Sequence, residues 1–183
     1  MNKEINTISD KELVKRCIAY ERKYQEMLYR KYADKMYSVA MIYSNNNEDD
    51  ASDILQNGFI QVFKKIHTFK FNGSLESWIR RIIVNKAIEL YRKKVRERDN
   101  IAEYKTFAET ETEGILGNIN ADDLIKLVNS LPSKASVVLK LFAVEGYSHK
   151  EIAEKLKIKE GTSKSQLNRA RHLLKEAISK QNG

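Results

Sequence analysis

The side chains best suited to a chemical role lie along one face of a helix expected to begin near Glu160. At about 100° per residue, polar and basic side chains fall opposite an apolar stripe: Ser165, Asn168, Arg169 and His172, flanked by Lys164 and Lys175. Short polar and basic side chains on the first turns of a helix can enter a major groove and pair with base edges. The pattern favours DNA binding over its alternative, the solvated side of an ordinary amphipathic helix.

Catalysis has no comparable support in the chain. Three scattered histidines and one cysteine, Cys17, show neither metal-ligand nor triad spacing, and there is no glycine-rich phosphate loop. The single cysteine also excludes an intramolecular disulfide, and its helical surroundings favour a small buried hydrophobic side chain. We therefore expect no catalytic residues, no metal and no cofactor.

The DNA-facing helix is the second half of a helix-turn-helix predicted over residues 147–174. Ser148 and Glu151 form a capping box at the start of the first helix. Residues 157–159 are about as short as the turn of such a motif requires. The second helix has an apolar face with alternating spacings of four and three: Ser163, Leu167, Ala170, Leu174 and Ala177.

The composition predicts an all-helical protein. The 183 residues, 42% of them hydrophobic, suffice for one globular domain or two small helical ones. One proline and seven glycines leave room for long helices, and alternating β patterns are absent. No apolar run approaches the roughly 20 residues of a membrane span, and MNKEINTISD lacks a signal-peptide core, so we expect a cytoplasmic protein.

The net charge of +8 is distributed over two basic segments with an acidic segment between them. Residues 1–95 carry 18 basic and 12 acidic side chains, residues 96–121 carry 3 and 6, and residues 122–183 carry 12 and 7. In residues 96–121 the helical spacing of apolar residues also disappears, and acidic and small residues take its place, as is typical of a flexible linker. We expect two small helical domains, 1–95 and 122–183, joined by a flexible acidic linker, 96–121, with both domains facing nucleic acid.

In the first domain, the helix predicted to begin after the turn at residues 45–47 has the most regular spacing of apolar residues. Its predicted buried face steps by three and one: Ala51, Ile54, Leu55, Gly58, Phe59, Val62, Phe63 and Ile66. Ile60 lies at the centre of the opposite, polar face, beside Asp53 and Gln56. A single exposed apolar residue is ordinary. The competing hypothesis is a protein-contact patch.

An aromatic and basic loop over residues 67–75 comes next. Aromatic side chains beside cations can stack on unpaired bases, although for Phe69 we favour a place in the core. Asn72 or Ser74 caps the following helix, residues 75–94. That helix is expected to bury six apolar side chains: Leu75, Trp78, Ile79, Ile82, Ile83 and Leu90. Its exposed side is basic, which fits either solvation or a phosphate track, and carries Arg80, Arg81, Asn85 and Lys86.

Two regions of the chain resemble one known family. The C-terminal segment is similar to the promoter-binding region of sigma-70-superfamily factors, specifically the extracytoplasmic-function (ECF) group: LPSKASVVLKLFAVEGYSHKEIAEKLKIKEGTSKSQLNRARHLL. The second region of that group resembles DASDILQNGFIQVFKKI followed by FNGSLESWIRRIIVNKAIELYRKK. The resemblance implies a non-enzymatic specificity subunit that binds core RNA polymerase, recognises two promoter elements and helps to open the DNA.

The resemblance also implies roles for matching residues. Contacts to the polymerase clamp helices would come from Asp50, Asp53, Gln56 and Ile60. The minus-10 element would be bound by Phe71, Asn72, Gly73, Ser74, Trp78, Asn85 and Lys86, with Arg80 and Arg81 on the same helix. The minus-35 element would be recognised by Thr162, Lys164, Ser165, Asn168 and Arg169, with Arg171 and Lys175 on phosphates.

Further partners follow from the same resemblance. An anti-sigma factor is expected, and a membrane-linked one is common in the family. The first region of housekeeping members and their long segment between the second and fourth regions have no counterpart here, so we expect DNA recognition to depend on the polymerase. The alternative is a stand-alone helix-turn-helix regulator that acts as a dimer, which would protect a palindromic site without polymerase.

Overall fold

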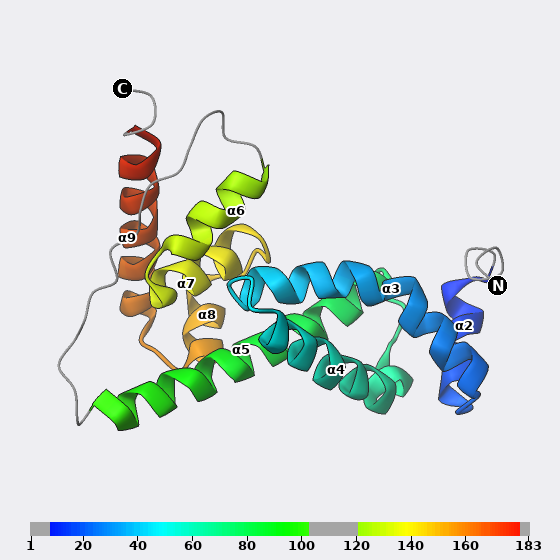
Figure 1. Cartoon of the computed structure of the whole chain (residues 1–183). Helices are drawn as coiled ribbons and strands as arrows, with labels where there is room; N and C mark the ends of the chain where they lie inside the picture. The colour runs from blue at the N-terminus through cyan, green and yellow to red at the C-terminus, as the bar shows by residue number, and fades with distance from the viewer. Residues whose placement is uncertain (1–7, 103–120, 180–183) are drawn as a thin grey trace. The chain divides into compact units, whose positions relative to one another are not determined.

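The computed structural model describes residues 8–102 and 121–179, and within those ranges the regular structure is entirely helical (Figure 1). The chain divides into two compact units, Met1–Tyr91 and Arg92–Gly183. The described elements, in chain order, are α2 (Asp10–Ile18), α3 (Arg22–Tyr43), α4 (Glu48–Lys65), the 3₁₀ turn η1 (Ile66–Thr68), α5 (Leu75–Ala102), α6 (Ala121–Ser130), α7 (Ser133–Ala143), α8 (His149–Leu156) and α9 (Glu160–Ser179). The prediction of an all-helical fold is confirmed.

Side-chain caps explain where the helices of the first unit begin. Ser9 Oγ accepts a hydrogen bond from the Glu12 amide at 3.2 Å, which starts α2. Asn47 Oδ1 accepts from the Asp50 amide at 2.8 Å, which starts α4. Each cap of this kind stabilises a helix by about 1 kcal/mol. Of the two residues that could cap α5, Ser74 does so, because its Oγ accepts from the backbone N–H of residue 77 at 3.1 Å.

The core of the first unit is built on α3 packed against α4 and on α2 packed against α3 and η1, and α5 meets α4 where Ile83 approaches Gly58. Its largest fully buried side chains come from all four helices: Leu13, Val14, Leu28, Met36, Val62, Leu75, Ile79, Ile83 and Val84. Gly58 allows the closest approach, because a Cβ atom there would lie 2.2 Å from Ile83 Cδ1. The face of α4 that carries Gly58 therefore meets α5.

Two expectations for the helix after the loop are wrong. Trp78, Ile82 and Leu90 are only half-buried, whereas Val84, Ala87 and Ile88 are buried in their place. The contacts with the neighbouring helices, which no single-helix pattern contains, decide which apolar residues are covered. The helix also continues past residue 94 to Ala102, because residues 95–102 contain neither glycine nor proline. The rest of the predicted linker, residues 103–120, lies outside the described residues.

The second unit packs α7 against α8 and α9, with α6 on α7 and α9. Leu131, Ala135 and Ala170 form a buried cluster there. The predicted capping box of α8 is present, with the Ser148 side chain accepting from the Glu151 amide and the Glu151 carboxylate accepting from the Ser148 amide. Helix α8 ends at Lys157, whose left-handed backbone (φ 57°) reverses the chain before α9 begins. The predicted helix-turn-helix is confirmed.

Candidate nucleic-acid interface and protein-contact face

Helix α9 exposes the polar face that the sequence predicts. Ser163, Leu167 and Ala170 are buried against the rest of the unit. Thr162 is half-buried, and the remaining candidate DNA-binding side chains are exposed: Lys164, Ser165, Asn168, Arg169, Arg171 and Lys175. The helix therefore offers a continuous surface of hydrogen-bond donors and acceptors with the size and chemistry that a major groove accepts.

Local contacts hold some of these side chains in the free protein. Lys164 Nζ lies 2.7 Å from Glu160 Oε1, and this bond lowers the pKa of the Glu160 carboxyl group. Both partners are exposed, so the pair contributes little to stability and Lys164 can exchange it for another acceptor. The Ser165 hydroxyl donates to the Thr162 carbonyl at 3.0 Å, which fixes that side chain close to the helix.

Two residues that the sequence analysis did not select, His149 and Phe142, attach α9 to the rest of the unit. His149 Nδ1 lies 2.9 Å from the buried Ser163 Oγ. The Phe142 ring stacks on His149 with ring centroids 4.9 Å apart, and the Arg171 guanidinium lies 5.7 Å from the Phe142 centroid. The one indication in the sequence was Ser163, a polar residue inside an apolar stripe, which needs a partner when buried.

The loop before α5 combines a buried aromatic ring with an exposed one. Phe69 is 9% exposed, which confirms its place in the core, and Phe71 is 48% exposed. The Phe71 ring packs on Phe69 with centroids 4.8 Å apart, and Phe69 also contacts Trp78 at 5.5 Å. Phe71 has a left-handed backbone (φ 58°), and Gly73 has φ 132°, which favours glycine. The loop thus exposes the Phe71 ring to solvent and supports it from below with the buried Phe69 ring.

Helix α5 brings only part of its predicted DNA-binding set onto one side. Trp78, Arg81 and Asn85 are spaced by three and four residues, so they share a face. Arg80 lies about 160° around the helix from Trp78. Lys86 Nζ forms an ion pair with Glu89 Oε2 at 2.6 Å and is 23% exposed. The structure therefore groups Phe71 and Trp78 with Arg81 and Asn85, and places Arg80 and Lys86 at the margins.

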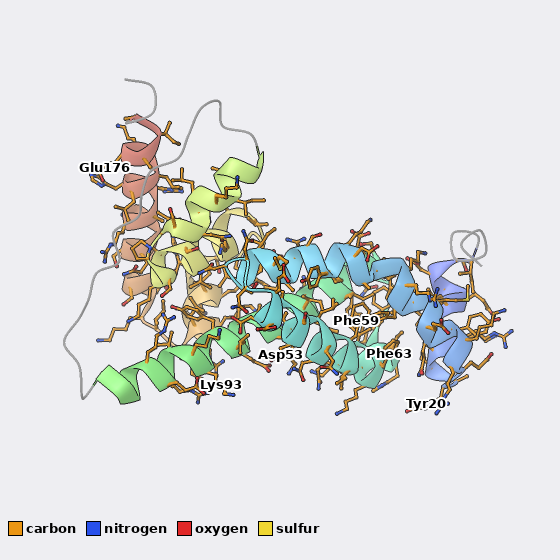
Figure 2. The ribbon with its side chains drawn as sticks, in the orientation of Figure 1. Tyr20, Asp53, Phe59, Phe63, Lys93 and Glu176 are labelled. Carbon is orange, nitrogen blue, oxygen red and sulfur yellow. The ribbon has the colours of Figure 1, made fainter. Side chains whose placement is uncertain are left out.

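The outward face of α4 is acidic and apolar. Asp53 and Gln56 are exposed, Asp50 is half-buried, and Ile60 is 43% exposed. Asn57 Nδ2 donates to the backbone carbonyl of Asp53 at 2.9 Å, so this bond does not involve the Asp53 carboxylate. Phe63, expected in the core, is half-buried and packs on Phe59 next to this face, with ring centroids 6.2 Å apart (Figure 2). The exposed apolar surface at Ile60 is thus larger than one residue.

Metal binding and membrane insertion have no structural support in the part of the chain that the structure describes. Among residues 8–102 and 121–179, no group of three or more histidine, cysteine, aspartate or glutamate side chains could hold a metal ion. Cys17 is buried, and desolvation raises the pKa of its thiol to about 11. No helix in the same part of the chain has the length and apolarity needed to span a bilayer.

Family models match both units. The model for Sigma-70 region 2 matches residues 28–97, which contain most of α3, all of α4 and most of α5. The model for Sigma-70, region 4 matches residues 121–174, which contain the helix-turn-helix. The two matches, in this order on an all-helical chain, define a sigma factor of the sigma-70 type.

Known proteins refine this class. The chain is 30% identical over 165 residues to the ECF RNA polymerase sigma factor SigW of Bacillus subtilis, covering 80% of this chain and 84% of that protein. It is 31% identical over 162 residues to the ECF RNA polymerase sigma factor SigE of Mycolicibacterium smegmatis, covering 84% of this chain and 61% of that protein. The protein described here belongs to the ECF group of sigma-70 factors.

Solved structures show the same fold. The sigma factor RpoE of Bartonella quintana, crystallised with the anti-sigma factor NepR, superposes with a TM-score of 0.51 at 22% identity, over 84% of this chain and 96% of that one. CnrH, solved in complex with the cytosolic domain of CnrY, gives a TM-score of 0.50 at 19% identity, over 93% and 97%.

Proposed function

We propose that this protein is a promoter-specificity subunit that binds core RNA polymerase, directs it to promoters through minus-10 and minus-35 elements and helps to open the DNA. One observation carries the proposal: both sigma-70 regions are matched in order on the chain, and each unit exposes a face of suitable chemistry. The protein has no catalytic site of its own in this role, and it works in the cytoplasm, where polymerase and promoters are found.

Recognition of the minus-35 element falls to α9. Five side chains on its first turns face the groove: Thr162, Lys164, Ser165, Asn168 and Arg169. Asn and Arg can form bidentate bonds with adenine and guanine edges, which is why these two carry most of the expected base discrimination. Arg171 and Lys175 lie further along the helix and contact phosphates, so they contribute affinity without sequence preference.

Capture of the minus-10 element falls to the loop before α5 and the first turns of that helix. The exposed Phe71 ring, supported by Phe69, offers a stacking surface for an unpaired base. The flanking loop residues 72–74 supply polar and backbone groups. Arg81 and Asn85, on the same side as Trp78, hold the strand, and Arg80 and Lys86 add charge at the edge.

Attachment to the polymerase falls to the outward face of α4. Asp50, Asp53 and Gln56 provide polar contacts around Ile60, and the half-buried Phe63 widens the apolar centre. An apolar centre with a polar rim is the usual anatomy of a protein interface. An anti-sigma factor, membrane-linked in some systems, is proposed as a second partner, because the sigma factor RpoE of Bartonella quintana was solved with the anti-sigma factor NepR.

In-vitro transcription tests the proposal. Core RNA polymerase is incubated with a fragmented genomic promoter pool, with and without the purified chain, and transcript ends are mapped. The expected result is a discrete set of start sites that depends on the added protein and that footprinting shows to be preceded by two unequal protected elements. If the chain stimulates no start site, the proposal is wrong.

The alternative function, a stand-alone dimeric regulator, has less support, because the region 2 match over residues 28–97 assigns the first unit to the sigma-70 fold rather than to a dimerisation or sensing domain. The same footprinting experiment separates the two functions. Protection of a palindromic site by the chain in the absence of polymerase would favour the dimer.

A further inference from the structure

The turn that joins α2 to α3 places a tyrosine where the backbone favours glycine. The amide of Tyr20 donates to the Cys17 carbonyl at 3.1 Å, and the amide of Glu21 donates to the Arg16 carbonyl at 3.2 Å. These two bonds are the Schellman pattern that ends many helices, in which the residue corresponding to Tyr20 is usually glycine. Tyr20 adopts the same left-handed backbone, with φ 59°.

The tyrosine ring gains nothing from the fold in return for this strained backbone. Tyr20 is 82% exposed, the largest exposed fraction among the large hydrophobic side chains described. Figure 2 labels it at the end of α2, where the turn into α3 begins. A glycine would make the same two backbone bonds without strain. The ring is therefore better explained by something it contacts outside the chain.

The charges around the turn indicate a polyanion. Lys11 and Lys15 are exposed one turn apart on α2, and Arg22 is exposed at the start of α3. Two carboxylates near the turn, Glu12 and Glu21, both bind Arg16, at 2.7 and 3.1 Å, and the exposed Glu26 of α3 pairs with Arg30 at 2.7 Å. The local surface is thus left with an excess of positive charge beside an exposed aromatic ring. Aromatic rings flanked by cations bind single-stranded nucleic acid by stacking on bases and contacting phosphates.

The position of α2 in the first unit supports the same partner. Helix α2 packs against η1, and η1 leads directly into the loop that exposes Phe71. A helix of nine residues is about 13 Å long, which is the length of a few nucleotides of extended strand. One unpaired strand could therefore contact both the Phe71 loop and the α2 turn.

We propose that Tyr20, with Lys11, Lys15 and Arg22, forms a second binding site for single-stranded DNA on the first unit. The Tyr20 ring stacks on an unpaired base and the three cations contact the neighbouring phosphates. This site goes beyond the proposed minus-10 contacts, and it does not depend on the identity of the promoter.

The test uses the full chain and a fluorescein-labelled (dT)20 oligonucleotide, with binding measured by anisotropy at several salt concentrations. Tyr20→Gly should weaken binding at least about fivefold, as expected for the loss of one base–aromatic stack, while its melting temperature stays the same or rises because the strain is relieved. Tyr20→Phe should bind like the wild type. Lys15→Gln should lower the slope of log affinity against log salt by about 0.7.

Asn46→Gly is the matched control, because Asn46 also has a left-handed backbone (φ 61°) and lies in the turn between α3 and α4. It should bind (dT)20 like the wild type. Equal binding by Tyr20→Gly and the wild type would overturn the proposal, as would a Tyr20→Gly variant whose only loss is affinity for core polymerase. The polymerase-dependent transcription assay is separate, so its failure would count against the proposed function and not against this site.

Discussion

At the scale of single residues, most of the proposed chemistry rests on exposed side chains whose neighbours fix them in place. Phe71 lies on Phe69, and Arg171 lies over Phe142. Such supports lower the entropy lost on binding, because the side chain is already close to its bound position. Lys140 differs from these residues, because its side chain is only 3% exposed and burying its charge is unfavourable.

Base recognition and phosphate contact should separate on α9. Arg169→Ala should weaken holoenzyme binding by about 1–3 kcal/mol at particular minus-35 base pairs, whereas Lys175→Ala should weaken binding to all minus-35 sequences about equally. Competition among promoter fragments with single base-pair changes in the minus-35 element measures both. A uniform loss for Arg169→Ala would show that this residue does not recognise bases.

Ile60 should be a polymerase contact rather than an ordinary exposed residue. Ile60→Ser should leave the melting temperature nearly unchanged and lower the affinity for core polymerase by roughly 1–2 kcal/mol. Ile18→Ser is the matched control, since Ile18 is also 43% exposed but lies on α2. Fluorescence titration of labelled protein with core enzyme gives both affinities. Similar losses in the two variants would contradict a specific role for Ile60.

Lys140 should make the stability of the second unit depend on pH. Burial lowers the pKa of its ammonium group to about 8 from 10.5. The unfolded chain therefore binds more protons between pH 8 and 10.5, and stability rises with pH across that window by a total on the order of 3 kcal/mol. Below pH 8 the full cost of burying the charge is present, offset in part by the bond from Lys140 Nζ to Asn129 Oδ1 at 2.8 Å.

Denaturant unfolding at pH 7 and 9.5 checks this expectation. Lys140→Met should lose most of the gain in stability between the two pH values, while Lys134→Met, an exposed lysine on the same helix, should keep it. If both variants respond to pH like the wild type, Lys140 is not buried as a perturbed cation.

At the scale of elements, close helix packing and helix ends determine how the proposed faces are presented. Helix α4 approaches α5 through Gly58, while the next residue, Phe59, meets the Tyr29 ring of α3 with centroids 4.8 Å apart. Held on two sides, α4 must turn Asp53, Gln56 and Ile60 outward. In the second unit, the capping box of α8 and the His149–Ser163 bond fix the angle at which α9 leaves the turn.

Two glycine substitutions should have opposite effects on stability. Gly58→Ala should destabilise the protein by about 1–2 kcal/mol, because the clash with Ile83 exceeds the gain in helix propensity. Gly161→Ala should stabilise it by up to about 1 kcal/mol, since no atom lies within 4 Å of the added Cβ. Denaturant unfolding measures both, and a stabilised Gly58→Ala variant would show that the α4–α5 contact is not tight.

At the scale of the whole molecule, the net positive charge and the division into two units both affect how the protein binds DNA. The chain carries 33 basic and 25 acidic side chains, which favours weak binding to any DNA. Specific recognition requires the two units to act on the same promoter, and the polymerase is the proposed partner that makes this possible.

Salt should therefore separate the two kinds of binding. For the chain alone, affinity for non-promoter duplex should fall steeply as salt rises from 50 to 200 mM, with a log–log slope near 0.9 per phosphate contacted. Promoter complexes with core polymerase should persist at salt concentrations where the binding of the chain alone is lost. Filter binding over a salt series measures both, and salt-resistant, sequence-specific binding by the chain alone would favour the dimeric regulator.

The sequence by itself determined most of the helices, their caps and the polar face of α9, because these depend on local spacing and on side chains within one turn. It also placed the outward face of α4 correctly, since the helical period is regular there. Only the tertiary structure decided which apolar side chains of α5 are buried, because neighbouring helices cover them. The His149–Ser163 bond and the support of Phe71 by Phe69 likewise join residues through packing, and the exposure of Tyr20 on a strained turn is a property of three-dimensional form that no spacing rule contains.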